Sequence, residues 1–163
     1  MKKINYLALL LFTVFSCKTE VSKQFSEEAL NDSLITLNGE RISFKDILKS
    51  HEGKTVLIDV WASWCKDCIE GMPKVEALQA EFTEVAYVFL SLDKSEDSWK
   101  KGIEKYDVKG AHYFMASGKK SPLGSFINID WIPRYMVLDK AGNIVLFKAI
   151  EADDPKLIEA LKK

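Results

Sequence analysis

Residues 55–68 have the sequence TVLIDVWASWCKDC, in which an apolar run leads directly into a pair of cysteines. The run up to residue 61 is interrupted only by Asp59 and predicts a central strand that is buried on both faces. A helix is expected to follow over 65–82, because apolar residues recur there at helical spacing: Met72, Val75, Leu78 and Phe82. Cys65 and Cys68 therefore fall at a junction between a strand and a helix.

Further along the chain, strands and helices continue to alternate. Residues 85–92 form a second apolar run, and Ser95 can cap a helix after it. Residues 134–138 and 143–147 predict two strands joined by a tight turn, and Pro155 suits the first position of a final helix. This order predicts an α/β fold whose central mixed sheet has helices on both faces.

Two segments are less regular. An N-terminal hairpin is expected over 34–42, because Asn38-Gly39 is a strong signal for a two-residue turn with positive φ at both positions. Ser43 can cap a short helix after the hairpin. The central segment 94–130 is expected to be irregular from residue 107 onward, apart from a short helix over 123–127.

The N-terminus has the pattern of a targeting signal. Residues 1–17 combine two lysines, about a dozen apolar residues and the ending Val14-Phe15-Ser16-Cys17. This ending resembles a bacterial lipobox, which implies lipidation of Cys17, although Phe15 departs from the usual small residue. An ordinary secretory signal is the alternative. Residues 18–33 are polar and predict a tether, with a short helix as an option, before a domain over 34–163.

Composition limits the possible classes of protein. The chain has 163 residues, of which 47% are hydrophobic and 29% charged, as in a folded domain with its own core. The net charge of -1 argues against a nucleic-acid-binding protein, which needs a basic face. The chain has only 3 cysteines, so a small disulfide-stapled scaffold is excluded. If Cys17 carries lipid, the other two can pair only with each other.

The spacing of Cys65 and Cys68 points to thiol–disulfide exchange. At a helix N-terminus the backbone N–H groups and the helix dipole stabilise a thiolate, which makes Cys65 the candidate nucleophile. Cys68, one turn later, is the candidate resolving cysteine that attacks the mixed disulfide. A structural disulfide and half of a zinc site are the alternatives. A c-type haem site is excluded because Ile69, not histidine, follows the second cysteine.

The chain resembles the thioredoxin-fold family, and within it the TlpA/ResA-like extracytoplasmic oxidoreductases. Asp59 stands where thioredoxins have a buried acid, and Pro73 where they have a proline within the helix. Ile132-Pro133 precedes a strand, as the cis-proline of the family does. The signal, the N-terminal hairpin and the longer central segment favour the TlpA/ResA-like group, which implies a thioredoxin-like domain anchored in the bacterial envelope.

The resemblance implies roles for several residues. Burial should raise the pKa of Asp59, which suits a proton carrier for Cys68. Trp64, Ile132 and a cis Pro133 are expected to contact the substrate, with the Ile132 backbone free to pair with a substrate strand. No cofactor is expected beyond the reversible Cys65–Cys68 disulfide, and no metal. No histidine lies between the cysteines, unlike in strongly oxidising DsbA-like motifs, which favours a reductant.

The same resemblance implies partners and a location. The substrates are expected to be proteins with disulfides, including apocytochromes c during cytochrome c biogenesis. Electrons are expected from a membrane thiol transporter of the DsbD/CcdA type, and the location is the periplasm. The inner and outer membranes are not distinguished.

Two other functions stay open. A Cu(I) metallochaperone could hold copper between Cys65 and Cys68. A thiol peroxidase is the second, although Ala62 and Ile58 stand where peroxiredoxins have threonine and proline. Four other residues are expected to be structural: His51 and His112 at the surface or in loops, and Trp99 and Trp131 in core or loop packing.

Overall fold

Seven strands form one mixed sheet in the order β2-β1-β5-β4-β3-β6-β7. The computed structural model describes residues 23–162, so the predicted signal and Cys17 lie outside the described residues. The strands are β1 Ser33–Ile35, β2 Arg41–Ser43, β3 Val56–Trp61, β4 Ala86–Ser91, β5 Ala111–Phe114, β6 Arg134–Leu138 and β7 Ile144–Ala149. Between residues 23 and 162 no helix is long and apolar enough to cross a bilayer.

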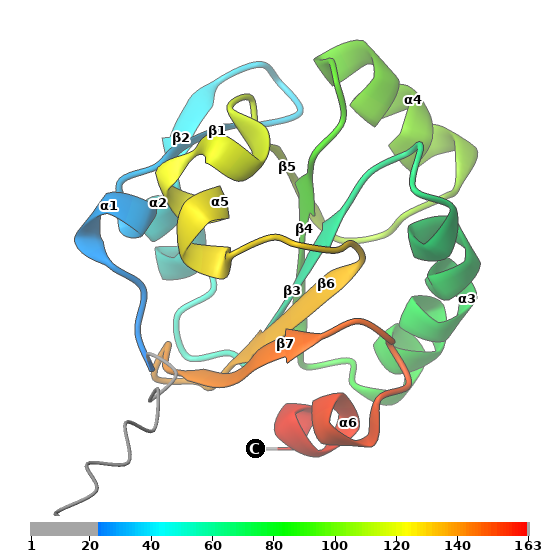
Figure 1. The fold of residues 1–163 in the computed structure, drawn as a ribbon. Coiled ribbons are helices and arrows are strands. Elements are labelled where there is room, and N and C mark those ends of the chain that lie inside the picture. The colour runs from blue at the N-terminus through cyan, green and yellow to red at the C-terminus, as the bar shows by residue number, and fades with distance from the viewer. Residues whose placement is uncertain (1–22, 163) are drawn as a thin grey trace, which may run out of the picture.

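Helices cover both faces of this sheet. They are α1 Glu27–Leu30, α2 Phe44–Lys49, α3 Lys66–Glu81, α4 Glu96–Lys105, α5 Pro122–Ile127 and α6 Pro155–Leu161, with a 3-10 turn, η1, at Gly118–Lys120. In Figure 1, α3 and α4 lie to the right of the strands, and α1, α2 and α5 lie to the left. The predicted α/β fold is confirmed.

β3 is the centre of the sheet. All six of its residues are buried, as its apolar run predicts, and it pairs parallel with β4 and antiparallel with β6. Because β3 and β4 are parallel, their carboxyl ends meet at one edge of the sheet. α3 begins there directly after β3, and it continues as one helix through Pro73.

The central segment contains a strand that the sequence analysis did not predict. β5 pairs parallel with β4 and places His112 opposite Phe89, so residues 107–130 are more regular than expected. The expectation of a surface or loop position for His112 is wrong: the residue lies in β5, is 6% exposed, and its ring stacks on Phe89. Its Nε2 lies 2.9 Å from the carbonyl oxygen of Val108, while burial lowers the pKa of the imidazole.

The folded domain begins before residue 34. Phe25 is buried and packs against the rings of Phe44 and Phe126, at centroid distances of 4.9 and 5.0 Å. Ala29 on α1 is fully buried. The predicted tether therefore does not extend to residue 33, because Phe25 and Ala29 anchor an otherwise polar segment to the core.

The N-terminal hairpin forms, but with a different turn. Gly39 has a φ of 82°, whereas Asn38 is not among the described residues with positive φ. The Gly39 N–H donates to the Thr36 carbonyl at 2.9 Å, and the Thr36 N–H donates to Glu40 at 2.9 Å. This pattern is a three-residue loop in which glycine alone takes the left-handed conformation, so the predicted two-residue turn is wrong.

Candidate active site

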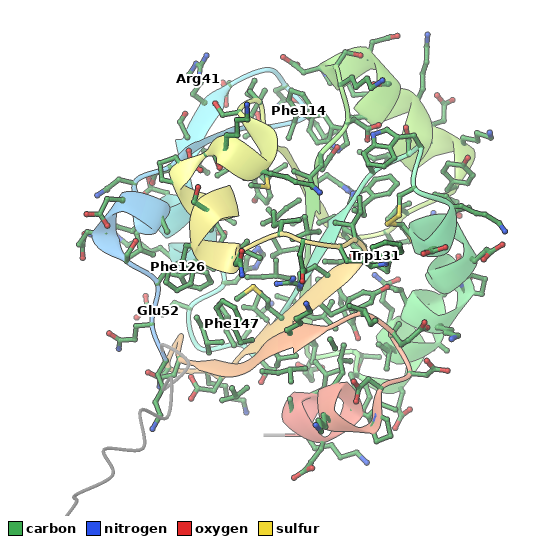
Figure 2. All side chains as sticks on the ribbon, in the orientation of Figure 1. Arg41, Glu52, Phe114, Phe126, Trp131 and Phe147 are labelled. Atoms are coloured by element: carbon green, nitrogen blue, oxygen red, sulfur yellow. A yellow bond between two sulfur atoms is a disulfide. The ribbon has the colours of Figure 1, made fainter. Side chains whose placement is uncertain are left out.

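The two cysteines are joined by a disulfide at the start of α3. The bond between Cys65 and Cys68 is drawn in yellow in Figure 2. Cys65 is the N-cap of α3, and its Sγ accepts a hydrogen bond from the Cys68 N–H at 3.1 Å. Cys65 is 6% exposed and Cys68 is 1% exposed, so the first sulfur is the more accessible one. This arrangement places the candidate nucleophile where helix N–H groups can stabilise its thiolate.

A second loop meets the disulfide from the other side. The Ile132–Pro133 peptide bond is cis, and the carbonyl oxygen of Ile132 lies 3.6 Å from Cys65 Sγ. The loop is separated from Cys65 by 67 residues in sequence, and β6 brings it to β3 by antiparallel pairing. The geometry leaves the backbone of this loop beside the reacting sulfur.

Arg134, directly after the cis-proline, holds this loop in place through hydrogen bonds from its buried side chain. Its guanidinium is 1% exposed and donates to the carbonyl oxygens of Ile127 at 2.8 Å and Asn128 at 3.2 Å. It also forms an ion pair with Asp130. A buried charge needs pairing and hydrogen bonds; the Nη1 and Nη2 groups of Arg134 find them in this loop, while its Nε has no partner among residues 23–162.

Two tryptophans next to these loops are exposed. Trp64 precedes Cys65 and is 57% exposed. Trp131, which is labelled in Figure 2, precedes Ile132 and is 56% exposed. The sequence predicts core or loop packing for Trp131, and the structure places it on the loop before the cis-proline, exposed rather than in the core. Trp99, in contrast, is fully buried as expected.

Asp59 is a buried carboxyl group without a hydrogen-bond partner among residues 23–162. It is 1% exposed and stands directly opposite Tyr135 in the β3–β6 pairing. The Tyr135 hydroxyl lies 3.3 Å from the position that a Cβ on Gly71 would take, so this face of the sheet is the one covered by α3. Directly opposed residues project from the same face, so Asp59 also points toward the helix that carries Cys68.

The lack of solvent changes the acidity of Asp59. Loss of solvation raises the pKa of its carboxyl group to about 8. Near neutral pH the group can therefore either hold or release a proton, which the predicted role requires.

A second buried acid, which the sequence pattern did not predict, lies at this edge of the sheet. Asp93 follows β4, is 6% exposed, and accepts hydrogen bonds from the hydroxyl groups of Ser63 and Ser91 at 2.6 and 2.9 Å. It also accepts from the Ser63 N–H at 3.1 Å. A polar residue at the carboxyl end of a strand parallel to β3 was the available signal, but only the folded chain shows its partners.

Lys66 is exposed and pairs with Glu70 at 3.4 Å on the surface of α3. Within the described range 23–162, no group of three or more His, Cys, Asp or Glu side chains could hold a metal ion.

Comparisons with known proteins agree with this geometry. The family model described as "Thioredoxin-like" matches residues 53–144. The chain is 34% identical over 145 residues to thioredoxin-like protein YneN of Bacillus subtilis, covering 86% of this chain and 80% of that protein. It is 29% identical over 124 residues to the thiol-disulfide oxidoreductase ResA of Bacillus cereus, covering 75% of this chain and 68% of the relative.

A solved structure shows the same arrangement of elements. It is a solution structure of a protein assigned as a thiol-disulfide oxidoreductase from Bacteroides vulgatus, which aligns with a TM-score of 0.69 at 29% identity. The alignment covers 84% of this chain and 88% of that one. Together with the Cys65–Cys68 disulfide, these matches show that the chain belongs to the thioredoxin-like family and is a thiol-disulfide oxidoreductase.

Proposed function

We propose that this oxidoreductase is a reductant of protein disulfides in the bacterial envelope. The observation that carries the proposal is the combination of the Cys65–Cys68 pair with the buried carboxyl group of Asp59, which faces the helix bearing Cys68. An acid that titrates near neutral pH and faces the helix of the resolving cysteine suits the release of a reduced product.

The reaction begins from the dithiol form. The Cys65 thiolate attacks one sulfur of the substrate disulfide, forms a mixed disulfide and releases the first substrate thiolate, which takes a proton from solvent. In the fraction of molecules whose Asp59 is ionised, the carboxylate then accepts the proton of the Cys68 thiol, and the Cys68 thiolate attacks Cys65. The second substrate thiolate leaves and is protonated, so the substrate gains two electrons and two protons while the enzyme becomes the disulfide.

Substrate contact is assigned to Trp64, Ile132 and Pro133. The exposed indole of Trp64 borders a surface hollow of about 290 Å³ that Cys65, Ile69 and Tyr106 also line. An extended substrate segment can pair with the backbone at Ile132 while one of its apolar side chains enters this hollow.

The predicted N-terminal features complete the proposal. Residues 1–17 act as the signal, Cys17 carries the lipid, and a polar tether leads to the domain that is packed from Phe25 onward. The electron donor is a membrane thiol transporter of the DsbD/CcdA type, and apocytochromes c are candidate substrates. The envelope location and these partners are carried over from the TlpA/ResA-like group.

A redox titration of the full-length chain tests the proposed direction. The Cys65–Cys68 couple is equilibrated in dithiothreitol or glutathione buffers, and reduction of insulin disulfides is assayed in parallel. We expect a reversible two-electron couple near or below the roughly -270 mV of thioredoxin, together with insulin reduction that Cys65→Ser abolishes.

Other outcomes assign other functions. A potential near the roughly -120 mV of DsbA would make the protein an oxidant and would remove the apocytochrome proposal. Tight Cu(I) retention by the reduced protein against a chelator, without a reversible couple, would favour the metallochaperone. Rapid consumption of peroxide by the reduced protein would favour the thiol peroxidase.

A further inference from the structure

The turn that leads into the nucleophile is held from behind by one carboxylate. Ser63 stands two residues before Cys65, and both its N–H and its hydroxyl donate to Asp93, at 3.1 and 2.6 Å. Ser91 supports the carboxylate from the end of β4: its hydroxyl donates to Asp93 at 2.9 Å and accepts from the Asp93 N–H at 3.0 Å. Every partner of the carboxylate therefore donates to it, which suits the ionised form.

The backbone of helix α4 also packs directly against Ser63. A Cβ placed on Gly102 would lie 2.4 Å from the Cβ of Ser63, closer than two carbon atoms can approach. Only glycine allows the helix backbone this close to the turn. Ser63 is thus confined between Asp93, two residues after β4, and Gly102 of α4.

Confinement of Ser63 fixes the position of Cys65. The Cys65 N–H donates to the Ala62 carbonyl at 3.0 Å, which closes a turn around Ser63. Displacement of Ser63 would therefore move the cysteine relative to the start of α3 and to the Ile132 carbonyl.

We propose that Asp93 is a positioning residue for Cys65, which fixes the turn and whose negative charge disfavours the Cys65 thiolate. A thiolate forms only in the dithiol state, so a like charge nearby destabilises the reduced protein and makes the couple more strongly reducing. This inference goes beyond the proposed function, because it requires only that Cys65 and Cys68 exchange between thiol and disulfide.

The substitution Asp93→Asn removes the charge and keeps the shape of the side chain. In the full-length reduced protein, the alkylation rate of Cys65 by iodoacetamide is measured against pH, and the midpoint potential is measured in dithiothreitol buffers. We expect a lower thiol pKa, an alkylation rate at pH 6 at least about threefold above the wild-type rate, and a less negative potential. The other charged groups around the cysteine, Asp59, Lys66, Asp67 and Lys94, are unchanged in this comparison.

Two variants separate the effect of the Asp93 charge on the Cys65 thiol from the effect of a less well-fixed turn at Ser63. Asp139→Asn is the matched control, since Asp139 also accepts backbone hydrogen bonds, from Ala141 at 2.9 Å and Asn143 at 2.8 Å, but at the other end of β6. It should leave the Cys65 profile unchanged. Ser63→Ala removes one donor and keeps the charge, so it should slow turnover without lowering the thiol pKa.

The proposal fails if folded Asp93→Asn protein has the wild-type alkylation profile and potential, or if Ser63→Ala lowers the thiol pKa equally. Should Asp93→Asn not fold, Gly102→Ala tests the confinement with every charge in place. Slower insulin reduction with an unchanged thiol pKa would support the proposal, and wild-type turnover would overturn it. Loss of insulin reduction in the wild type would instead count against the proposed function alone.

Discussion

Asp59 and Asp93 are both buried near the disulfide, but their surroundings are opposite. Asp59 has no hydrogen-bond partner in the described chain, whereas Asp93 accepts from two hydroxyl groups and a backbone N–H. Ionisation of the Asp59 carboxyl group costs free energy because no donor stabilises the charge, whereas the Asp93 carboxylate has its hydrogen-bond donors in place. Burial alone therefore does not assign a role to an acid; the presence or absence of donors does.

This difference predicts opposite uses. A carboxyl group without donors can exchange its proton near neutral pH and is suited to proton transfer. A carboxylate surrounded by donors holds its neighbours in place. The comparison can be tested by removing each acid, or one of its supports, and measuring both stability and turnover.

The largest expected effect is on the pH dependence of stability. The pKa of Asp59 is raised to about 8 in the folded protein, so between pH 4 and 8 the unfolded chain releases a proton that the folded chain keeps. Wild type should therefore lose stability as pH rises through this window, relative to Asp59→Asn, by up to about 5 kcal/mol. Urea unfolding of the oxidised proteins at several pH values measures the difference.

Asp153→Asn is the control for this experiment. A hydrogen bond from Lys74 lowers the pKa of Asp153, so its contribution is complete above the ordinary carboxyl range and is lost only at lower pH. Its difference from wild type should stay constant between pH 5 and 8. Parallel curves for wild type and Asp59→Asn would show that Asp59 does not carry the proposed proton.

The next effect in size is on catalysis. Asp59→Asn should slow insulin reduction about a hundredfold at pH 7, because the Cys68 thiol loses its proton acceptor. The defect should grow up to about pH 8, as more of the wild-type Asp59 becomes ionised, and should shrink only at higher pH, where solvent hydroxide can deprotonate the thiol. Acid quenching during turnover should reveal an accumulated mixed disulfide, for which Cys68→Ser provides the fully trapped reference. A pH-independent defect would indicate a structural role instead.

The smallest effect concerns the support of Asp93. Ser91→Ala removes one hydroxyl donor from the carboxylate and should lower the free energy of unfolding by about 1 kcal/mol. Unlike the Asp59 effect, this loss should be the same across neutral pH. Ser125→Ala, at an exposed position of α5, is the control, and urea unfolding midpoints measure both variants. A loss that varies with pH, as at Asp59, would remove the distinction between the two acids.

The sequence was most informative where one segment carries the signal alone. The apolar run at 56–61, the capping serines and the CxxC spacing depend on near neighbours, and the corresponding elements formed as predicted. The role of Ile132-Pro133 required a family resemblance, because its contact with Cys65 spans 67 residues.

Features that depend on distant partners were missed. β5 is short, and its pairing with β4 buries His112, which no local pattern indicates. In the sequence, Asp93 looks like an ordinary loop residue. Its role as a hydrogen-bond acceptor depends on Ser63, which is 30 residues away in sequence and is brought beside it only by folding. Phe25 belongs to the core only because α2 and α5 bring two other rings to it.

The point at which the chain joins the domain has a mechanical consequence. The Lys23 carbonyl accepts a hydrogen bond from the Ile144 N–H at 2.7 Å, at the end of the sheet where β6 turns into β7, whereas Cys65 follows the opposite end of β3. The six-residue strand β3 separates these ends by about 20 Å. A pull on the chain before Lys23 would therefore load the edge strand β7 and the Phe25 ring contacts first, at the end of the sheet away from the disulfide.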